Sequence, residues 1–375
     1  MKASKPMSLG VQPRGFGIYF IKNRDNIVGT FRWSDDDVAE LTENNGVPAH
    51  IAGDLNGWLE SRTPPKHRAY MERLLDVCGL KTLKSIIDFS KGLSLNDCLW
   101  VTNNEEHSWS NVNLFANEFS DVIARIAFDG GVHGVPFSTT SPEFGTDGML
   151  PKCWVRKGNE ILLYKGGTSG ACNAGYEPLS EVLAHQVLER LGYPHVPYYL
   201  ENFHGRRVSV CPLFTGEDRA YLPIYRVIQF STLRGLLVGA KEHGFETQLA
   251  QQLVFDYLSF NTDRHAGNFG CLVDPNSFEV LSMAPIFDNG MSMMCLWNGD
   301  DDMDEYCLDK HKRPALYDSY EEGAQRGKRI LGRSHNVERL IDFEFDLTKI
   351  GDYSIDRVLA IQSWFQRRVR TFLEM

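Results

Sequence analysis

The residues best suited to chemistry lie in two short segments in the second half of the chain. Asp263 precedes Asn268 by five positions in the segment 261–270, and Asp288 follows the apolar segment 284–287. Carboxylate and amide oxygens in this order can hold a hydroxyl group and Mg²⁺ around a phosphoryl group that is being transferred. About one Asp-x4-Asn spacing is expected by chance in a chain of this size. The interpretation therefore depends on the flanking residues.

The flanking residues predict elements that would bring these polar groups together. A pattern rich in Leu and Phe over 251–260 predicts a helix that leads into the first segment. The apolar residues 269–273 predict a strand that leaves it, and the turn residues 274–277 follow. A second apolar segment, 280–287, then returns the chain to the first loop.

Each polar residue of this set receives a role in phosphoryl transfer. Asp263 is predicted to accept the proton of the substrate hydroxyl, and Asn268 and Asp288 are predicted to bind Mg²⁺. The competing interpretation is that Asp263 and Asn268 build a tight turn and that Asp288 caps one. Three turn residues would not require this order or these neighbouring strands, so we prefer the catalytic interpretation.

A lysine further upstream fits the same chemistry. Lys165 ends the apolar strand predicted over 160–165, where an ammonium group needs a partner. We expect it to contact the α- and β-phosphates of a nucleotide and to be held by Glu181, near the start of a helix over 178–191. The alternative is an exposed lysine at a strand end, with Glu181 only favourable to the helix dipole. Glu177 is a weaker partner because it precedes the proline that opens the helix.

Two segments compete as the loop that binds phosphate. The polar, turn-rich segment 138–148 precedes the predicted strands, and its backbone N–H groups suit a phosphate. Its Ser141, Gly145 and Gly148 are therefore predicted nucleotide contacts. The glycine-rich segment 166–170 is not followed by Lys-Ser or Lys-Thr, so it is not a Walker loop. We expect it to connect a strand to a helix.

Composition limits the classes of protein that this chain can belong to. The sequence has 375 residues with 42% hydrophobic content, which is enough for two domains or one large one. Its net charge of −10 favours no direct contact with nucleic acid. The eight cysteines show no metal or disulfide spacing, and the sequence shows neither a signal peptide nor a membrane-spanning segment. We expect a cytoplasmic protein without membrane insertion.

A composition shift at 130–136 predicts a linker after a first region, 1–133. This region is predicted to serve packing or partner binding rather than chemistry. Its expected elements are a strand pair within 17–31, helices over 66–78 and 80–90, and helical spacing over 109–128. After the linker, the expected elements are strands over 149–157 and 160–165, a hairpin of 196–200 with 207–214, mainly helices from 226, and a last helix over 354–372.

Three smaller features receive simple interpretations. Among the eleven histidines, His265 is the one expected to matter, as an organiser of the catalytic loop and a neighbour of the nucleotide. The acidic segment 300–305 is expected to be a solvated loop. Arg367, Arg368 and Arg370 are expected to form the solvent face of the last helix.

The segments 261–270 and 284–290, together with Lys165 and Glu181, resemble the HipA-like serine/threonine protein kinases. The resemblance covers about residues 135–375 and is most specific over 261–290. It implies an α+β, two-lobed protein-kinase-like fold with an extra N-terminal α/β subdomain. The implied parts are an accessory subdomain of unknown role over 1–133, a small β-rich N-lobe over 134–215 and a mainly helical C-lobe over 216–375.

The same resemblance implies an activity and partners. It implies phosphorylation of a protein hydroxyl by ATP with Mg²⁺, with the nucleotide between the lobes. The family includes toxins of toxin–antitoxin pairs and a secreted effector, so an antitoxin-like partner and delivery as an effector are both implied. Members autophosphorylate a serine in the nucleotide loop, which here falls among Ser138, Thr139, Thr140 and Ser141. Residues 1–130 show no recognisable pattern of the toxin's amino-terminal subdomain.

Two other classes remain open at this point. Asp-Arg-His-x-x-Asn with a later Asp-Asn-Gly is also similar to the phosphatidylinositol kinases. The sequence shows no membrane-binding helix or polybasic loop near these motifs, which places a lipid kinase second. A pseudokinase that binds nucleotide without transfer is disfavoured because every polar role is filled.

Overall fold

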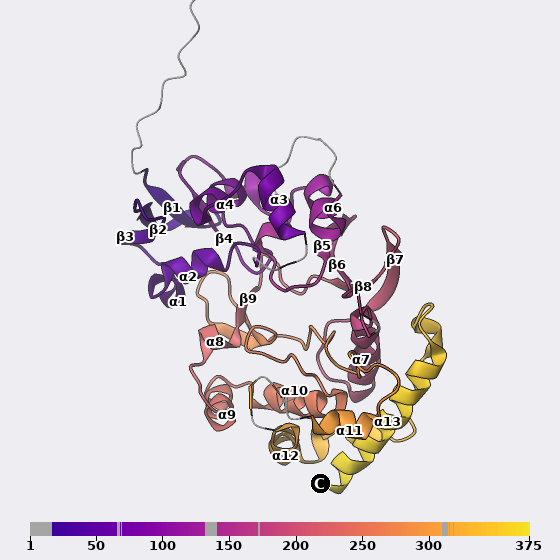
Figure 1. The fold of residues 1–375 in the computed structure, drawn as a ribbon. Helices are drawn as coiled ribbons and strands as arrows, with labels where there is room; N and C mark the ends of the chain where they lie inside the picture. Colours follow the sequence, from indigo (N-terminus) through magenta and orange to yellow (C-terminus); the bar gives the residue numbers. More distant parts are fainter. Residues whose placement is uncertain are drawn as a thin grey trace, which may run out of the picture.

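The computed structural model describes residues 17–65, 68, 70–131, 141–171, 173–309, 314, 316–317 and 319–375. Within these residues the chain forms three antiparallel sheets, one in each successive part of the sequence. Figure 1 shows the first two sheets at one end of the molecule and a mainly helical part at the other. The fold is therefore a mixed α/β arrangement in which each of the three regions combines a sheet with one or more helices.

The first region contains a four-stranded sheet in the order β3-β2-β1-β4. Its strands are β1 (Tyr19–Asn23), β2 (Asn26–Trp33), β3 (Ala39–Asn44) and β4 (Leu99–Thr102). Its helices are α1 (Ala49–Ala52), α2 (Leu55–Glu60), α3 (Met71–Cys78), α4 (Leu83–Ser90), α5 (Trp109–Val112) and α6 (Asp121–Asp129). The predicted strand pair within 17–31 is confirmed, because β1 pairs with β2 across a two-residue turn.

The helix predictions for this region are confirmed in part. The helix expected over 80–90 begins only at Leu83, because the Thr82 hydroxyl accepts from the backbone N–H of Ser85 and forms a capping box. The helical spacing over 109–128 corresponds to two helices rather than one. The second of these begins after Ser120, whose hydroxyl accepts from the N–H of Ile123 at 3.4 Å.

The second region contains a four-stranded sheet in the order β5-β6-β8-β7 and one long helix. The elements are β5 (Lys152–Lys157), β6 (Glu160–Gly166), α7 (Glu177–Leu191), β7 (Tyr199–Phe203) and β8 (Arg206–Pro212). The prediction that Glu177 lies outside the helix is wrong. The helix begins at this residue because a proline in the first turn has no N–H to lose from the helical hydrogen bonds.

The third region is mainly helical, with a small sheet in the order β11-β10-β9. Its elements are β9 (Ala220–Pro223), α8 (Ile224–Val227), α9 (Leu233–Glu242), α10 (Glu246–Ser259), β10 (Gly270–Val273), β11 (Val280–Met283), α11 (Met303–Leu308), α12 (Tyr320–Leu331) and α13 (Ile355–Glu374). The 3-10 helices are η1 (Pro142–Gly145), η2 (Gly332–His335), η3 (Val337–Leu340) and η4 (Leu347–Lys349). The predicted helix before the first catalytic segment is the end of α10, and the two predicted strands are β10 and β11.

The last helix, α13, corrects one surface prediction. Arg367 is exposed and pairs with Asp304 at 3.1 Å, as expected for a solvent face. Arg368 instead donates to the backbone carbonyl of Tyr257 at 2.9 Å and lies over its ring. The sequence pattern did not show this contact because it depends on α10, which packs against this face of α13.

The first region is attached to both of the others. Arg68 donates to the carbonyl of Lys152 in β5 at 2.7 Å. Asn23 donates to the carbonyl of Pro275, in the turn between β10 and β11, at 2.7 Å. Arg226 of α8 donates to the carbonyl of His50 at 3.2 Å. The first region therefore bridges the second and third regions.

In the part of the chain that the structure describes, no helix has the length and apolar character needed to cross a bilayer.

Candidate active site

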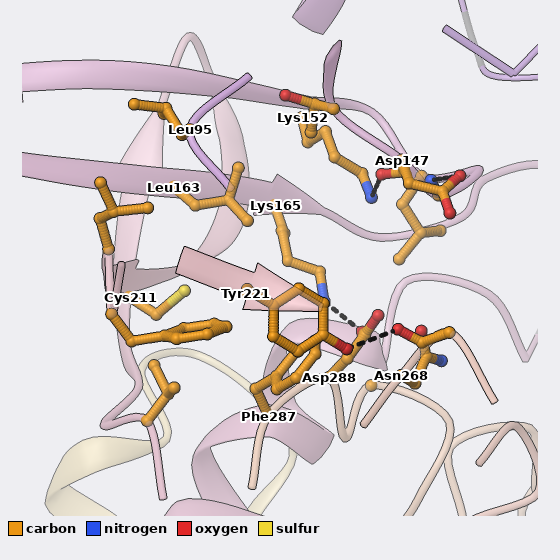
Figure 2. A pocket seen from close by; sticks show the side chains of 18 of the residues that line it. Leu95, Asp147, Lys152, Leu163, Lys165, Cys211, Tyr221, Asn268, Phe287 and Asp288 are labelled. Carbon is orange, nitrogen blue, oxygen red and sulfur yellow. Dashed lines mark hydrogen bonds and ion pairs between the residues drawn. The ribbon is translucent and has the colours of Figure 1, made fainter. Parts of the chain in front are cut away.

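A cavity of about 640 Å³ lies between the second sheet and the third region, and residues of the first region close one side of it. Its size is within the range of small-molecule sites. One end is mostly apolar and is formed in part by Leu95, Leu163, Cys211, Phe214, Tyr221 and Phe287. The other end carries Lys152, Lys165, Asp263, Asn268 and Asp288. Figure 2 shows this separation of apolar and charged side chains.

Lys165 is the central charge of the polar end. Its side chain is buried, and its Nζ lies 2.7 Å from Glu181 Oε1 and 2.5 Å from Asp288 Oδ1. Burial alone would lower the pKa of Lys165, but the carboxylates of Asp288 and Glu181 outweigh it and raise the pKa above its usual value. The ammonium therefore stays charged. The structure brings together the three residues that the sequence analysis had linked only by their expected roles.

Glu181 connects helix α7 to the loop that carries Asp288. Its Oε1 accepts from Lys165, and its Oε2 accepts from the backbone N–H of Asn289 at 2.8 Å. Both oxygens of a fully buried carboxylate are therefore paired, as burial requires. A movement of α7 would disturb the lysine and the aspartate together.

Asp288 has an unusual backbone and a depressed pKa. Its φ of 54° lies in the left-handed region, which aspartate adopts more readily than most residues. Its backbone N–H donates to the hydroxyl of Tyr198 at 3.2 Å. Burial would raise the pKa of Asp288, but the charges of Lys165 and then Lys152 hold it well below its usual range. The carboxylate is therefore ionised at any physiological pH.

Asp263 and Asn268 lie on the loop between α10 and β10. The amide nitrogen of Asn268 donates to the backbone carbonyl of Asp263 at 3.0 Å, so its amide oxygen is the atom left for a metal ion. The Asp263 side chain is exposed at the edge of the cavity. Partial removal from water raises its pKa, and the neighbouring His265 opposes that rise. A carboxylate in this position can approach a substrate that enters the cavity.

Arg264 holds this loop in place, although the sequence analysis gave it no role. Its buried guanidinium donates to Asp256 of α10 at 3.2 Å, to the carbonyls of Asn268 at 2.9 Å and Phe287 at 2.7 Å, and to Asn289 Oδ1 at 2.6 Å. One side chain thereby connects α10, the catalytic loop and the segment around Asp288. Two of its acceptors are backbone carbonyls, which no sequence pattern identifies.

His265 has a more local part in the loop. Its Nδ1 accepts from the backbone N–H of Gly267 at 3.0 Å, and the residue lines the cavity. The bond stabilises the turn between Asp263 and Asn268. His265 therefore supports the loop, while Arg264 connects it to its surroundings.

Lys152 is a second cationic residue of the cavity that the sequence analysis missed. The register of β5 and β6 places it directly opposite Lys165, so the two side chains share one face of the sheet. Its Nζ donates to the carbonyl of Asp147 at 2.7 Å. Burial, followed by the charge of Lys165, lowers the pKa of Lys152 to about 7. The available signal was strand pairing, since two lysines at paired positions must be neighbours.

The predicted nucleotide loop is only partly at the cavity. Gly145 and Gly148 line it, and a Cβ on Gly145 would come within 2.5 Å of the carbonyl of Leu93. Ser141 is not among the lining residues, because it is buried and its hydroxyl donates to Glu143. The other three residues considered for autophosphorylation, Ser138, Thr139 and Thr140, lie outside the described residues.

Glu177 also lines the cavity, but it does not pair with Lys165. Its Oε2 accepts from the backbone N–H of Thr168 at 3.2 Å. Thr168 belongs to the glycine-rich segment 166–170, which connects β6 to α7 as the sequence analysis expected. Glu177 therefore fixes this connection near the polar end of the cavity.

The donor set at the polar end fits Mg²⁺ bound together with phosphates. An ionised carboxylate, Asp288, and an amide oxygen, Asn268, are hard oxygen ligands. No group of three or more His, Cys, Asp or Glu side chains suited to a metal occurs among the described residues. Proteins usually hold Mg²⁺ through one or two side chains with substrate phosphates and water.

Comparison with known proteins gives fold similarity without sequence similarity. No family model matches the chain, and no curated protein sequence matches it. A solved structure of HipA, from the toxin–antitoxin system of Shewanella oneidensis MR-1 with HipB and operator DNA, has a TM-score of 0.54 and 13% identity. That match covers 95% of this chain and 98% of the other. The proinflammatory kinase CtkA of Helicobacter pylori has a TM-score of 0.40 and 16% identity, over 60% of this chain and 90% of the other.

The protein thus has a mixed α/β fold similar to that of HipA, which agrees with the implied fold at this coarser level. Because 95% of the chain is matched, the similarity includes most of residues 1–133. No toxin-like pattern is recognisable in the sequence of residues 1–130. At 13% identity the two folds are similar although the sequences share no recognisable pattern.

Proposed function

We propose that this protein is a kinase of HipA-like type that transfers the γ-phosphoryl group of ATP to a serine or threonine hydroxyl of a protein. One observation carries the proposal. Lys165 is ion-paired with both Glu181 and Asp288 at the polar end of a cavity that Asp263 and Asn268 also line. Lysine, helix glutamate, base, amide and metal-binding aspartate are the parts that phosphoryl transfer requires.

The proposal assigns the regions to two lobes and an accessory subdomain. Residues 134–215, with β5 to β8 and α7, would be the N-lobe, and residues 216–375 the helical C-lobe. Residues 1–133 would be the accessory subdomain. The nucleotide would lie in the cavity between the lobes, with its base at the apolar end. Its phosphates would lie near Lys165 and Lys152, whose ammonium groups can pair with them.

The chain's own residues would bring about the transfer mainly by positioning and charge. Asn268 and Asp288 would hold Mg²⁺, which when bound neutralises charge on the β- and γ-phosphates. As the substrate oxygen forms its bond to the γ-phosphorus, the bond to the ADP oxygen breaks. The hydroxyl proton would pass to Asp263. Lys165, fixed by Glu181, would stabilise the negative charge on the phosphates.

A partner protein of antitoxin type is part of the proposal. The HipA structure with similar fold contains HipB and operator DNA. That complex does not support the expectation, drawn from net charge, that this chain makes no direct contact with nucleic acid. The partner is therefore proposed without excluding a DNA contact.

Transfer of label from γ-labelled ATP tests the proposal. We expect Mg²⁺-dependent label on this protein or on proteins of a cell lysate, and its loss in Asp263→Asn. Asp300→Asn, at an exposed position in an acidic loop, is the matched control and should keep activity. Label only on phosphoinositide vesicles would replace the proposal with a lipid kinase. Tight ATP binding without any label, with or without lysate, would indicate a pseudokinase.

A further inference from the structure

The apolar end of the cavity includes residues from the first region. Ser94, Leu95 and Asn96 belong to the segment that connects α4 to β4, far in sequence from the other lining residues. Figure 2 shows Leu95 and Leu163 of β6 on the side of the cavity away from Asn268 and Asp288. One wall of the cavity is thus supplied by a region to which the sequence analysis assigned no chemistry.

Hydrogen bonds attach this segment directly to the polypeptide that follows β8. The hydroxyl of Thr215 donates to the carbonyl of Leu95 at 2.6 Å. The backbone N–H of Tyr221, in β9, donates to the carbonyl of Asn96 at 2.7 Å. Thr215 and Tyr221 themselves line the cavity. The segment is therefore joined to the chain that links the second and third regions at the cavity wall.

The first region also holds the segment from behind. Asp97 forms a buried ion pair with Arg62, with distances of 3.1 and 2.5 Å, and its Oδ1 accepts from the N–H of Leu99. The carbonyl of Leu93 lies so close to Gly145 that a side chain there would collide with it. With contacts on both sides, the position of Leu95 is determined before any ligand enters, which reduces the entropic cost of binding.

The chemistry of this wall suits a flat apolar group. Leu95, Leu163 and Cys211 provide aliphatic and thiol surface. The rings of Phe214 and Phe287 line the same end, tilted by 38° to each other with their centroids 5.1 Å apart. Lys152 and Lys165 lie at the other end. A nucleotide has the same polarity, with a planar base at one end and charged phosphates at the other. Only one orientation of the nucleotide satisfies both ends.

We infer that Leu95 covers the base of the bound nucleotide, so that the first region is a component of the nucleotide site. This inference rests on the proposed function and adds a residue that determines nucleotide affinity. Because the segment 93–97 belongs to the first region, nucleotide binding stabilises the attachment of that region to the other two. A second ligand that binds the first region and alters this segment would change the affinity for nucleotide. By linkage, nucleotide would change the affinity for that second ligand by the same factor.

Calorimetric titration of MgADP into the full chain tests the inference with two matched variants. Leu95 is only 4% exposed, so Leu95→Ala removes a small apolar contact to the base and should weaken MgADP binding about twofold to fourfold. Leu93→Ala is the control, because Leu93 is equally buried in the same segment and the same apolar cluster but does not line the cavity. It should lower stability similarly and change MgADP affinity less than about twofold.

Hydrogen exchange of the wild-type chain provides a second measurement that needs no variant. MgADP should slow exchange in the segment 93–97 and leave the strand β2, in the same region but away from the cavity, unchanged. Equal MgADP affinities for Leu95→Ala and Leu93→Ala, or unchanged exchange in 93–97, would overturn the inference and leave the kinase proposal intact. A wild-type chain that binds no MgADP would overturn both.

Discussion

Two walls of the cavity carry polar groups and are built in different ways. One is formed by the loop of Asp263 and Asn268 with the segment around Asp288, and the other by the segment 141–152. The catalytic loop and the segment around Asp288 are close in sequence, and one buried arginine, Arg264, ties them to α10. The segment 141–152 opposite depends on distant residues, because Arg68 donates to the carbonyls of Glu143 and Thr146 at 3.1 Å and of Lys152 at 2.7 Å. The chemistry of a site is thus visible in sequence where short segments carry the geometry, and it is hidden where remote contacts do.

The largest expected effect is on the chemical step at the catalytic loop. Asp263→Asn removes the proposed base but keeps the size of the side chain. We expect turnover to fall about 10²- to 10⁴-fold. MgADP affinity should stay within about threefold, because Lys165, Glu181 and Asp288 remain in place. Steady-state kinetics and calorimetry measure the two quantities. Normal turnover in this variant would remove Asp263 from the mechanism.

The next effect concerns the buried ion pair that supports the loop. Arg264→Met leaves Asp256 buried without a cation, and loss of one partner from a buried pair costs about 3–5 kcal/mol. Burial raises the pKa of Asp256, and Arg264 opposes that rise, so the variant should be less destabilised at low pH. Urea unfolding at several pH values measures this.

The matched control for Arg264 is an arginine in an exposed pair. Arg326→Met breaks the pair with Glu322 on the surface of α12, where pairs contribute about 0.3–0.5 kcal/mol. A loss at Arg264 no larger than at Arg326 would contradict the supporting role of the buried network.

The sequence predicted that Asp263, Asn268 and Asp288 lie close together, because their spacing follows the loop and the strands next to it. Asp263 and Asn268 lie between α10 and β10, and Asp288 lies shortly after β11. All three residues line one cavity. Lys165 and Glu181 also followed from the strand and helix patterns. The supporting role of Arg264 did not follow, since its acceptors are mainly backbone carbonyls and buried polar groups.

The opposite wall could not be predicted to the same degree. Lys152 faces the cavity only because β5 pairs with β6 in one register, and a strand pattern alone does not fix register. Ser141 had seemed a phosphate contact because of its polar neighbours. The structure buries it against Glu143, a carboxylate with no exposed surface, within the segment that the sequence pattern described only as polar and turn-rich.

An intermediate effect is expected at Ser141. Its hydroxyl and the N–H of Trp154 are donors to the buried Glu143 carboxylate. Loss of one donor to a buried charged group costs about 1–3 kcal/mol, so Ser141→Ala should lower the free energy of unfolding by this amount. MgADP affinity should change less than about twofold, because the residue does not line the cavity.

Ser363→Ala is the control for Ser141, because its hydroxyl is exposed on α13 and only bonds to a helix carbonyl. Denaturant unfolding and calorimetry of both variants separate stability from binding. A Ser141→Ala variant with normal stability and weak MgADP binding would restore Ser141 as a nucleotide contact.

The smallest effect is a pH dependence at the wall that the sequence missed. Burial, then the charge of Lys165, lowers the pKa of Lys152 to about 7, so the protein without nucleotide loses this positive charge as the pH rises through 7. The phosphates of a bound nucleotide favour the charged form of Lys152, so the pKa of Lys152 is higher in the nucleotide complex. Above pH 7, nucleotide binding is therefore accompanied by the uptake of a proton. Nucleotide affinity should therefore fall with rising pH, by up to about tenfold per pH unit.

The Lys152→Met variant separates the pH dependence caused by Lys152 from the titration of the nucleotide itself. The wild type and the variant bind the same nucleotide, so a difference between their pH profiles comes from the protein. Calorimetry between pH 6 and 8.5 should show weaker binding of MgADP by the variant at pH 6 and a shallower decline above 7. Lys81→Met, at an exposed position of the first region, should retain the wild-type profile. If the Lys152 variant kept the full slope, the charge lost near pH 7 would belong to another group. The two lysines on one face of β5 and β6 would then not act together on the phosphates.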